Sequence, residues 1–324
     1  MYKFTSFVVK QSHVILLLVV CAAAAVITPS FLKAENIANI IIQQIPYYAI
    51  MAFGMTMAVI LKGIDLSIGA NMALSSCVGG YFIVNGQIAA GILASLAVGI
   101  LIGLTNGILI TKIHLPPFIA TYCMDWISKG IAYVMMMGAI FYPMPAGYRA
   151  VSTGAFLGIP SLLWITFIIF ALLVFLMSKT IFGRNVYTTG SNINAAKLSG
   201  VNTDKVITTV YIMNGILASI AGLLLIARLN AADATYESGW SIKLIAAVLI
   251  GGTPMKGGTG SVGRTLVGVL IITVINNCLN MLNVSSLWQQ FVIGSVIILS
   301  IFVTLLNDKI KEWNKNRQMK NVLG

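Results

Sequence analysis

The sequence predicts an all-α, polytopic membrane protein with about ten transmembrane helices and both termini in the cytoplasm. The first reason is composition: of the 324 residues, 58% are hydrophobic and 9% are charged, and the mean hydropathy is +0.95. Soluble domains carry about 25% charged residues. The second reason is pattern, because apolar stretches close to the roughly 20 residues that a spanning helix needs follow one another along the chain. We therefore expect one transmembrane domain over residues 1–324.

The apolar stretches define the expected spans, and short polar connections separate them. The eighth stretch is too short to cross a bilayer as drawn, so we expect it to be broken or to extend further. In order, the expected spans cover residues 14–31, 41–61, 66–85, 88–111, 118–140, 160–178, 206–229, 243–253, 265–282 and 287–306.

The basic residues predict the orientation. With the N-terminus inside and the spans alternating, 15 of the 20 Lys and Arg residues lie on the inner side and 3 on the outer side. Cytoplasmic loops are enriched in Lys and Arg, so both termini are expected in the cytoplasm. The net charge of +12 then reflects topology, and we expect no nucleic-acid partner. Residues 307–324 form a basic cytoplasmic tail suited to contact the membrane surface.

The sequence indicates neither metal chemistry nor a nucleotide site. The four cysteines each lie inside an apolar run without a CxxC pair, and the two histidines lie at the ends of different spans. Residues 252–259 resemble a P-loop, but Gly258 takes the place of the phosphate-binding lysine. Residues 258–263 match a dinucleotide fingerprint without a surrounding βαβ unit. We expect no cofactor and no metal on this chain, so any ATPase that drives it would be another chain.

A glycine-flanked turn is expected where the second span meets the third, on the cytoplasmic side. Its residues are Gly63, Asp65, Ser67 and Gly69. A carboxylate beside a span is costly unless it caps a helix or is paired. We interpret Asp65 or Ser67 as a cap of the third span, with direct contact to a solute as the alternative. A related glycine pattern at 257–263 suggests an internal duplication.

The longest polar interruption inside the chain is residues 182–206. Good helix formers occupy its middle between Gly190 and Gly200, where Gly200 is suited to end a helix and Ser191 or Asn192 to begin it. We expect a short helix presented outside the membrane, and the orientation places it in the cytoplasm. The spacing alone leaves a second interpretation open, a solvated connector.

Five motifs occur in order along the chain: GIDLSIGANMALSS at 63–76, PPFIAT at 116–121, GRNVYTTGSNINAAKLSGVNTDKV at 183–206, IAAVLIGGTPMKGGTGSVG at 245–263 and NNCLNMLNVSSLWQQFVIGSVIILS at 276–300. Together they resemble the ribose-type sugar permeases of bacterial ATP-binding-cassette (ABC) importers. That family also serves galactose, xylose, autoinducer-2 and nucleosides, so the resemblance is highly specific for the family and weakly specific for the solute.

The resemblance implies a function for the polar interruption. In such permeases the corresponding loop, here 179–205, forms a cytoplasmic coupling helix that docks into a groove of the ABC ATP-binding subunit. It also implies an extracytoplasmic solute-binding protein, a second permease chain that is identical or homologous, and a place in the bacterial cytoplasmic membrane. The residues implied in ATPase coupling are Gly183, Arg184, Gly190, Asn194, Ala195, Ala196, Lys197, Leu198 and Gly200, with Gly190 and Gly200 as turns.

Polar side chains within the spans are candidates for the translocation path. Asp125 and Lys129 would share a helix face and pair in the favourable acid-before-base order. They are either polar contacts near the path or a self-neutralising structural pair. The asparagines either bind sugar hydroxyls or join helices, at roughly 0.6 kcal/mol each. The candidates are Asn71, Asn106, Asp125, Lys129, Asn276 and Asn277, and Asn214 and Asn280 are of the same kind.

Some positions depart from the family pattern. Ser241 and Lys243 stand where the family usually has Glu and Asp, Arg264 where it has Gly, and Asp125 where it has an apolar residue. The first two departures are expected on the outer side, where they would alter contacts with the binding protein or with the entering solute. Arg264 lies in a glycine-rich turn and is expected to add cytoplasmic charge.

Two other classes of function are weighed against the ABC importer. An ion- or proton-driven carrier would need a buried titratable residue, and Asp65 and Asp125 are the available carboxylates, but it has no use for an ATPase-docking helix. An intramembrane enzyme is disfavoured because the spans hold no metal-ligand set. The expected role is therefore a non-enzymatic transport subunit for a monosaccharide or a sugar-like solute.

Overall fold

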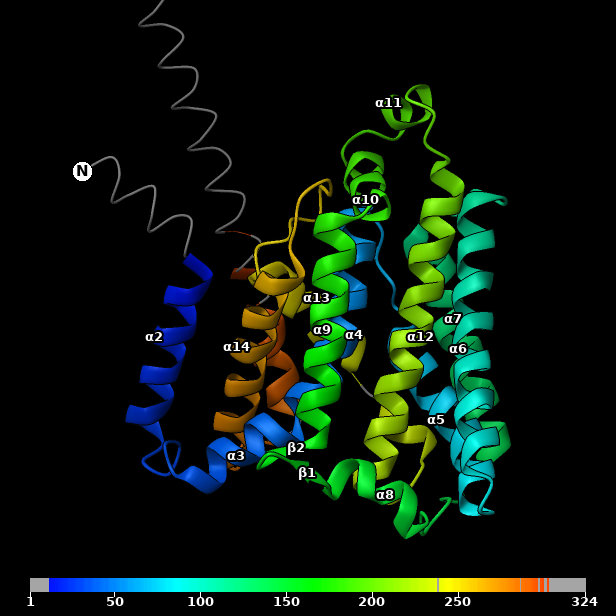
Figure 1. Cartoon of the computed structure of the whole chain (residues 1–324). Helices are drawn as coiled ribbons and strands as arrows, with labels where there is room; N and C mark the ends of the chain where they lie inside the picture. Colours follow the sequence, from blue (N-terminus) through cyan, green and yellow to red (C-terminus); the bar gives the residue numbers. More distant parts are fainter. Residues whose placement is uncertain (1–11, 238, 286, 297, 300–301, 303–324) are drawn as a thin grey trace, which may run out of the picture.

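The computed structural model describes residues 12–237, 239–285, 287–296, 298–299 and 302 (Figure 1). These residues form helices almost throughout, so the predicted all-α class is confirmed, apart from two antiparallel strands of two residues each. The elements are α2 (Ser12–Ile27), α3 (Ala34–Gln43), α4 (Ile45–Ile60), α5 (Ile68–Val84), α6 (Ile88–Thr111), α7 (Pro117–Met136), α8 (Ala146–Thr153), β1 (Ala155–Phe156), β2 (Ile159–Pro160), α9 (Ser161–Lys179), α10 (Ile181–Ser191), α11 (Ile193–Leu198), α12 (Thr203–Leu229), η1 (Ala234–Glu237), α13 (Trp240–Ile250) and α14 (Val262–Met281).

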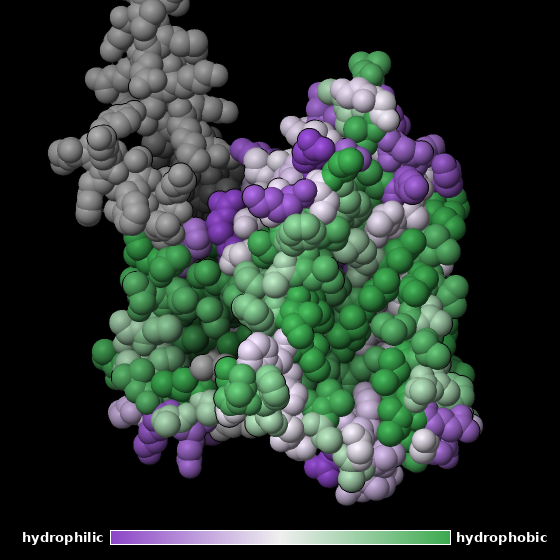
Figure 2. All heavy atoms as spheres, in the orientation of Figure 1, coloured by the Kyte–Doolittle hydropathy of each residue, from purple (hydrophilic) through white to green (hydrophobic). Residues whose placement is uncertain are grey.

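Each of the first nine expected spans falls on one of these helices. By length and composition, four of them can cross a membrane: α6, α9, α12 and α14. The shorter apolar helices α2, α4 and α5 lie alongside them, and the tenth expected span lies partly outside the described residues. Figure 2 shows a hydrophobic band between two hydrophilic ends, as a bilayer requires. One end carries α10 and α11, and the other carries α8, β1 and β2 (Figure 1).

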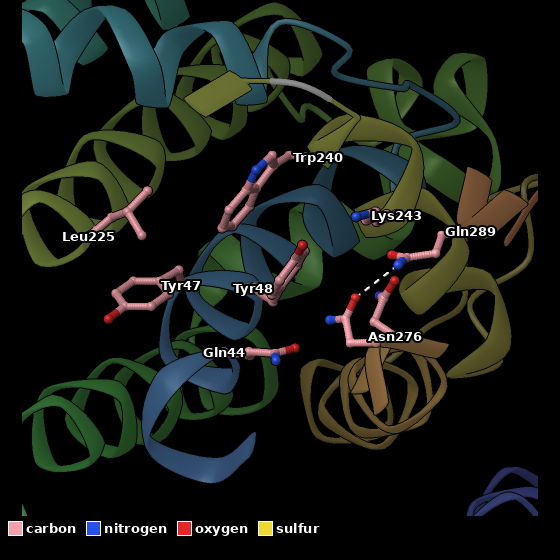
Figure 3. Close-up of a pocket in the computed structure, with 9 residues that line it drawn as sticks. Gln44, Tyr47, Tyr48, Leu225, Trp240, Lys243, Asn276 and Gln289 are labelled. Atoms are coloured by element: carbon pink, nitrogen blue, oxygen red, sulfur yellow. Dashed lines mark hydrogen bonds between the residues drawn. The ribbon is translucent and has the colours of Figure 1, made fainter. Parts of the chain in front are cut away.

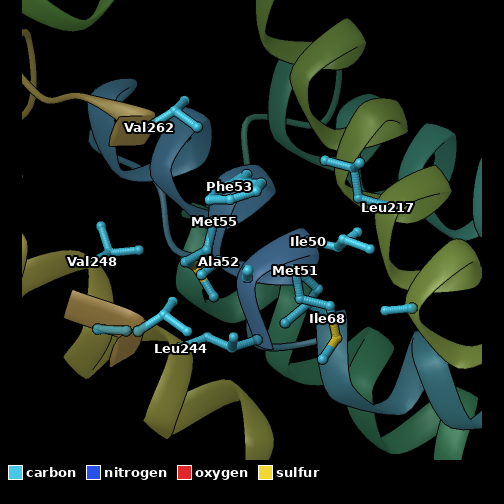
Figure 4. Packing of buried hydrophobic residues seen from close by; sticks show 14 of the residues in the cluster. Ile50, Met51, Ala52, Phe53, Met55, Ile68, Leu217, Leu244, Val248 and Val262 are labelled. Carbon is cyan, nitrogen blue, oxygen red and sulfur yellow. The ribbon is translucent and has the colours of Figure 1, made fainter. Parts of the chain in front are cut away.

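Helix α4 is the centre of the packing. All of its residues except Tyr48 are buried, which explains why it is apolar on every face. It contacts α12 on one side and α13, α14 and α9 on the other. In Figure 4, Met51 and Phe53 of α4 lie between Leu217 of α12 and Val248 of α13. A polar residue on α4 would therefore face the protein interior and not lipid.

Glycines let α6 and α12 approach each other closely. A Cβ atom at Gly99 would lie 2.3 Å from the carbonyl oxygen of Gly215, and one at Gly103 would lie 2.3 Å from that of Tyr211. Small residues at spacings of four are the usual means by which membrane helices bring their backbones together. These two glycines of α6 are thus packing residues, and they do not interrupt the helix.

Two breaks interrupt the α-helical framework: residues 61–67 between α4 and α5, and the segment between α12 and α13, which contains the short 3₁₀ helix η1. The 11 residues of α13 extend about 16 Å, roughly half of a bilayer core, which explains why the eighth apolar stretch is short. The first turns of α5 and α13 meet where Ser241 Oγ donates to the Leu66 carbonyl at 2.7 Å and accepts from the Gly69 N–H at 3.3 Å.

The duplication suggested by the glycine patterns at 63–69 and 257–263 stays a prediction. The first pattern follows the end of α4, and residues 257–261 belong to the loop that joins α13 to α14. The two segments meet near the α11 end, where the Gly258 N–H donates to the Ile60 carbonyl at 2.8 Å.

Candidate functional site

Helix α11 stands at the tip of one end of the molecule (Figure 1). Asn192 begins it, because its Oδ1 accepts from the N–H groups of Asn194 at 3.0 Å and Ala195 at 3.1 Å. Gly200, at φ +83°, ends it: its N–H bonds to the Lys197 carbonyl, and the N–H of Val201 bonds to the Ala196 carbonyl. These two bonds form a Schellman motif. The expected helix with its start and stop is present.

The side chains of α11 divide into an outer and an inner set. Leu198 is 91% exposed and Ile193 is 41% exposed, which leaves two apolar groups open at the tip, beside the exposed Ala195 and Lys197. Ala196 is 3% exposed and faces the rest of the molecule. The sequence grouped Ala196 with the docking residues, but its side chain is covered by the chain itself.

Helix α10 joins α11 to the body of the protein. A Cβ atom at Gly190 would lie 1.9 Å from the Ile60 carbonyl oxygen, and one at Gly183 would lie 2.2 Å from that of Met177. Gly190 therefore lies within α10 as a close contact to the end of α4, and not in a turn before α11 as the sequence suggested. Arg184 is exposed on the same helix.

The α13–α14 loop closes this junction. The Gly258 N–H donates to the Ile60 carbonyl at 2.8 Å, and Tyr187 of α10 donates its hydroxyl to the Gly260 carbonyl at 3.1 Å. Burial raises the pKa of the Tyr187 phenol, and the positive charge of Arg264 opposes that shift. The end of α4, helix α10 and the loop are thus in direct contact with one another, and α11 is attached to α10.

Asp65 lies inside the protein, whereas the sequence placed it at a cytoplasmic turn. It is 3% exposed and accepts from Ser67 N at 3.0 Å, Ser67 Oγ at 2.6 Å and Asn214 Nδ2 at 3.2 Å. Asn106 Nδ2 donates to the same Ser67 hydroxyl at 2.8 Å. Asn214 lies about 16 Å along α12 from its start, so this is a polar network at depth. Ser67 occupies the N-cap position of α5, and its own N–H and hydroxyl both donate to Asp65.

Asp125 and Lys129 form the expected pair on α7. Lys129 Nζ lies 2.8 Å from Asp125 Oδ2 and 5.5 Å from the centre of the Trp126 ring. Both charged side chains are mostly buried. One turn away, Thr121 bonds to the 61–67 break, since its Oγ1 accepts from the Leu66 N–H at 3.1 Å. The pair therefore lies beside the Asp65 network.

The structure separates the candidate asparagines into different places. Asn71 and Asn106 are buried near the 61–67 break. Asn277 exchanges two amide hydrogen bonds with Asn36, at 2.9 and 3.0 Å, and so joins α14 to α3. Asn276 is 5% exposed and its Oδ1 has no hydrogen-bond partner among the described residues. Asn276 also lines a cavity.

That cavity, of about 230 Å³, lies between α4, α13 and α14 (Figure 3). Tyr48 and Trp240 stack along one side with ring centres 4.3 Å apart and planes 10° apart. Lys243, Gln289 and Asn276 gather on the side away from Leu225 (Figure 3). The sequence missed Tyr48 and Gln44 here and treated Lys243 only as a family departure. The available signal was a tryptophan and a lysine at the start of the short eighth apolar stretch.

The chain is similar to known transport proteins over most of its length. Residues 36–301 match the family described as "Branched-chain amino acid transport system / permease component". The ribose import permease protein of Escherichia coli (strain K12) is 36% identical over 312 residues, which cover 93% of this chain and 95% of the relative. The ribose import permease protein of Bacillus subtilis (strain 168) is 39% identical over 89% of this chain and 90% of the relative.

A third relative is named for a different sugar. The D-allose transport system permease protein of Escherichia coli (strain K12) is 32% identical over 95% of this chain and 95% of the relative. No solved structure matches the chain significantly.

Proposed function

Because the chain belongs to the family of permease components of ABC importers, we propose that it carries a monosaccharide or a sugar-like solute across the bacterial cytoplasmic membrane. It is a transport subunit and not an enzyme, since ATP hydrolysis in these systems resides on a separate subunit. This membership favours the importer over the ion-driven carrier. The relatives named for ribose and D-allose both support a sugar as the solute class.

The proposed topology has ten spans, with both termini and the α11 end in the cytoplasm. Exposed basic residues at the α11 end support this orientation, because Lys and Arg are enriched in cytoplasmic loops. Lys62 donates to the Ser191 carbonyl at 3.1 Å there, and Lys112 pairs with Asp204 at 3.0 Å. Lys33 and Arg149 belong to the opposite end, beside α3 and within α8. The loop of α8, β1 and β2 then faces the extracytoplasmic side, where a solute-binding protein would dock.

Helix α11 is the proposed docking element for the ATP-binding subunit. The observation that carries this proposal is the exposed Leu198 at the tip of a helix that is capped at both ends. An apolar side chain in water is suited to fill a pocket of a partner. Movement of the partner would pass through α10 to Ile60 and to the α13–α14 loop, both of which contact α10. Alternating access would follow as the helices beyond these contacts repack.

The complete importer would contain two permease chains, identical or homologous, two ATP-binding domains and an external binding protein. The first experiment is affinity capture of the solubilised chain from its native membrane in mild detergent. Leu198→Glu should reduce the co-purified ATP-binding subunit by about tenfold, the effect of about 1.4 kcal/mol of lost contact. Leu198 is almost fully exposed, so the variant should keep its own fold and melting temperature.

Leu157→Glu is the matched control for this capture. Leu157 is 78% exposed and lies between β1 and β2 at the other end of the molecule, so the ATP-binding subunit should remain bound. Equal capture by wild type and Leu198→Glu would remove α11 as the docking element. Absence of any ATP-binding subunit with wild type in several mild detergents would count against the importer assembly itself.

A further inference from the structure

We propose that the cavity between α4, α13 and α14 is a solute site that selects a small polyhydroxylated molecule with a negative charge, such as a sugar acid or a sugar phosphate. This inference rests on the proposed function, because it names the class of solute within the sugar-like range. It is carried by the groups that line the cavity. These are one cation, several amides and a stacked aromatic pair, without a carboxylate among the lining residues that the structure describes.

The charge of the cavity comes from Lys243. This residue lies in the first turn of α13 and is partly buried, and among the described side chains no acid forms an ion pair with it. The start of α13 has no side-chain cap, so the helix dipole adds to the positive potential at the same place. A buried lysine in a low-dielectric region favours an anionic partner. A neutral sugar would leave this charge without compensation.

The amides supply the groups that bind hydroxyls. Asn276 lines the cavity and is more than nine-tenths buried, and its Oδ1 has no hydrogen-bond partner among the described residues. Buried polar oxygens are normally bonded, so this atom indicates a missing donor. Gln289 Nε2 donates to Asn280 Oδ1 at 2.8 Å, which orients both amides at the cavity wall. A sugar hydroxyl can donate to Asn276 and accept from a neighbouring amide at once.

The aromatic pair accounts for the remaining side of the site. Tyr48 and Trp240 stack against each other and present a rigid, flat and largely apolar wall (Figure 3). Such a wall suits the C–H face of a sugar ring, while the hydroxyls and the anionic group meet the polar side. The volume of about 230 Å³ equals about seven or eight waters at about 30 Å³ each, which fits one small solute and not a peptide.

The test measures the charge preference of the cavity directly. Asn280→Cys, an exposed lining position, and Asn276→Cys, a deeper one, are placed separately in a chain whose four native cysteines are serine. Each is reacted in membranes with two methanethiosulfonate reagents of similar size, one carrying a sulfonate and one a trimethylammonium group. The sulfonate reagent should react about tenfold faster, as positively lined clefts concentrate anions. Lys243→Gln should bring the ratio of rates close to one.

Protection experiments identify the solute class. D-ribonate and D-ribose 5-phosphate at millimolar concentration should each slow the labelling of Asn280→Cys more than D-ribose does. Protection by D-ribonate alone or by D-ribose 5-phosphate alone would assign the charge to a carboxylate or to a phosphate. Lys33→Gln is the matched control, because Lys33 is an exposed lysine outside the cavity and its removal should leave the ratio of rates unchanged.

Two results would overturn the inference. Equal rates for both reagents, unchanged by Lys243→Gln, would show that the cavity has no preference for anions. Labelling of both cysteines only after denaturation would show that the cavity does not communicate with water and is no solute site. Either result leaves capture of the ATP-binding subunit through Leu198 untouched, so failure of this inference is distinguishable from failure of the proposed function.

Discussion

Two breaks lead into helices whose first turns meet inside the protein: residues 61–67 lead from α4 into α5, and residues 230–237 and 239 lead from α12 into α13. Their polar groups have different partners. The first break is closed by side chains of the protein: Asp65 accepts three hydrogen bonds, and Thr121 bonds to its backbone. The second leads to Trp240 and Lys243, which line a cavity. In a membrane interior, irregular backbone persists only where protein or a water-filled cavity satisfies it.

This difference assigns separate roles to the two breaks. The first break, where Asp65 accepts from Asn214 of α12 and Ser67 accepts from Asn106 of α6, is a structural element that holds α4, α5, α6 and α12 together. The second break leads to Lys243, which lines a cavity with Asn276 of α14, and this cavity is prepared for a ligand. The two breaks remain linked, because Ser241 of α13 bonds to the backbone of Leu66 in the first break and of Gly69 at the start of α5. Substitutions in the first break should therefore act on stability, and those in the cavity on solute selection.

Asp65→Ala gives the largest expected effect. It leaves the Ser67 N–H, the Ser67 hydroxyl and the Asn214 amide without their acceptor. We expect a loss of about 3 kcal/mol or more in the free energy of unfolding, because each buried unsatisfied group costs about 1–3 kcal/mol. Thermal unfolding in detergent is the measurement. Asp65→Asn keeps one acceptor oxygen and should lose less.

The variants Asp65→Ala and Asp65→Asn together decide whether Asp65 has a structural role or contacts the solute. If Asp65→Ala melts like wild type in the assembled importer but abolishes solute uptake, Asp65 contacts the solute or the path, and the first break is not merely structural. The comparison between the two breaks would then have to be abandoned. A parallel loss of stability and uptake, with partial recovery of both in Asp65→Asn, supports the structural role.

Gly190→Ala should have the next largest effect, because it acts on the contact between α10 and the end of α4. The added methyl would meet the Ile60 carbonyl oxygen, a backbone atom that cannot rotate away. Overpacking of this kind costs about 1–3 kcal/mol, and we also expect weaker coupling between ATP hydrolysis and uptake. Gly86→Ala is the control, because Gly86 lies between α5 and α6, away from α11. It has no neighbouring atom within 4 Å, and only its left-handed backbone at φ +79° is strained, at about 1 kcal/mol.

The measurement for this pair is solute transported per ATP hydrolysed by the reconstituted importer. Gly190→Ala should lower that ratio, whereas Gly86→Ala should change stability slightly and leave the ratio unchanged. An unchanged ratio in Gly190→Ala, with reduced stability, would mean that α11 acts through another route. The junction that links α11 to the first break would then be only a packing contact.

The sequence predicted the long apolar helices and the short helix α11 because their signals are local. Apolar length marks a span, and Asn192 and Gly200 mark the ends of α11 through their own backbone and side-chain bonds. The eighth stretch was recognised as too short, although its start inside the protein was not. Local patterns sufficed wherever the structure depends on neighbours in the chain.

The depth of Asp65 and the existence of the cavity could not be predicted in this way. Asp65 follows a turn at the end of α4 and looks like a surface residue until Asn214, 149 residues later, is brought against it. The cavity likewise combines Tyr48, Trp240 and Asn276, which belong to three distant helices. Gly190 was misplaced for the same reason, since its role depends on Ile60. The surroundings of these residues depend on packing between distant segments, which a local sequence pattern does not encode.

Ser241→Ala is expected to give the smallest effect, and it tests the link between the breaks. The variant removes a hydroxyl that donates to the Leu66 carbonyl and accepts from the Gly69 N–H, which should cost about 1–2 kcal/mol. Ser178→Ala is the control, because Ser178 is exposed and its hydroxyl bonds within its own helix, so this variant should melt at the same temperature as wild type.

The informative measurement is a double-mutant cycle that combines Ser241→Ala with Asp65→Asn. A coupling above about 0.5 kcal/mol means that the breaks act as one unit, whereas additive losses mean that the Ser241 contact is incidental and the two breaks are independent.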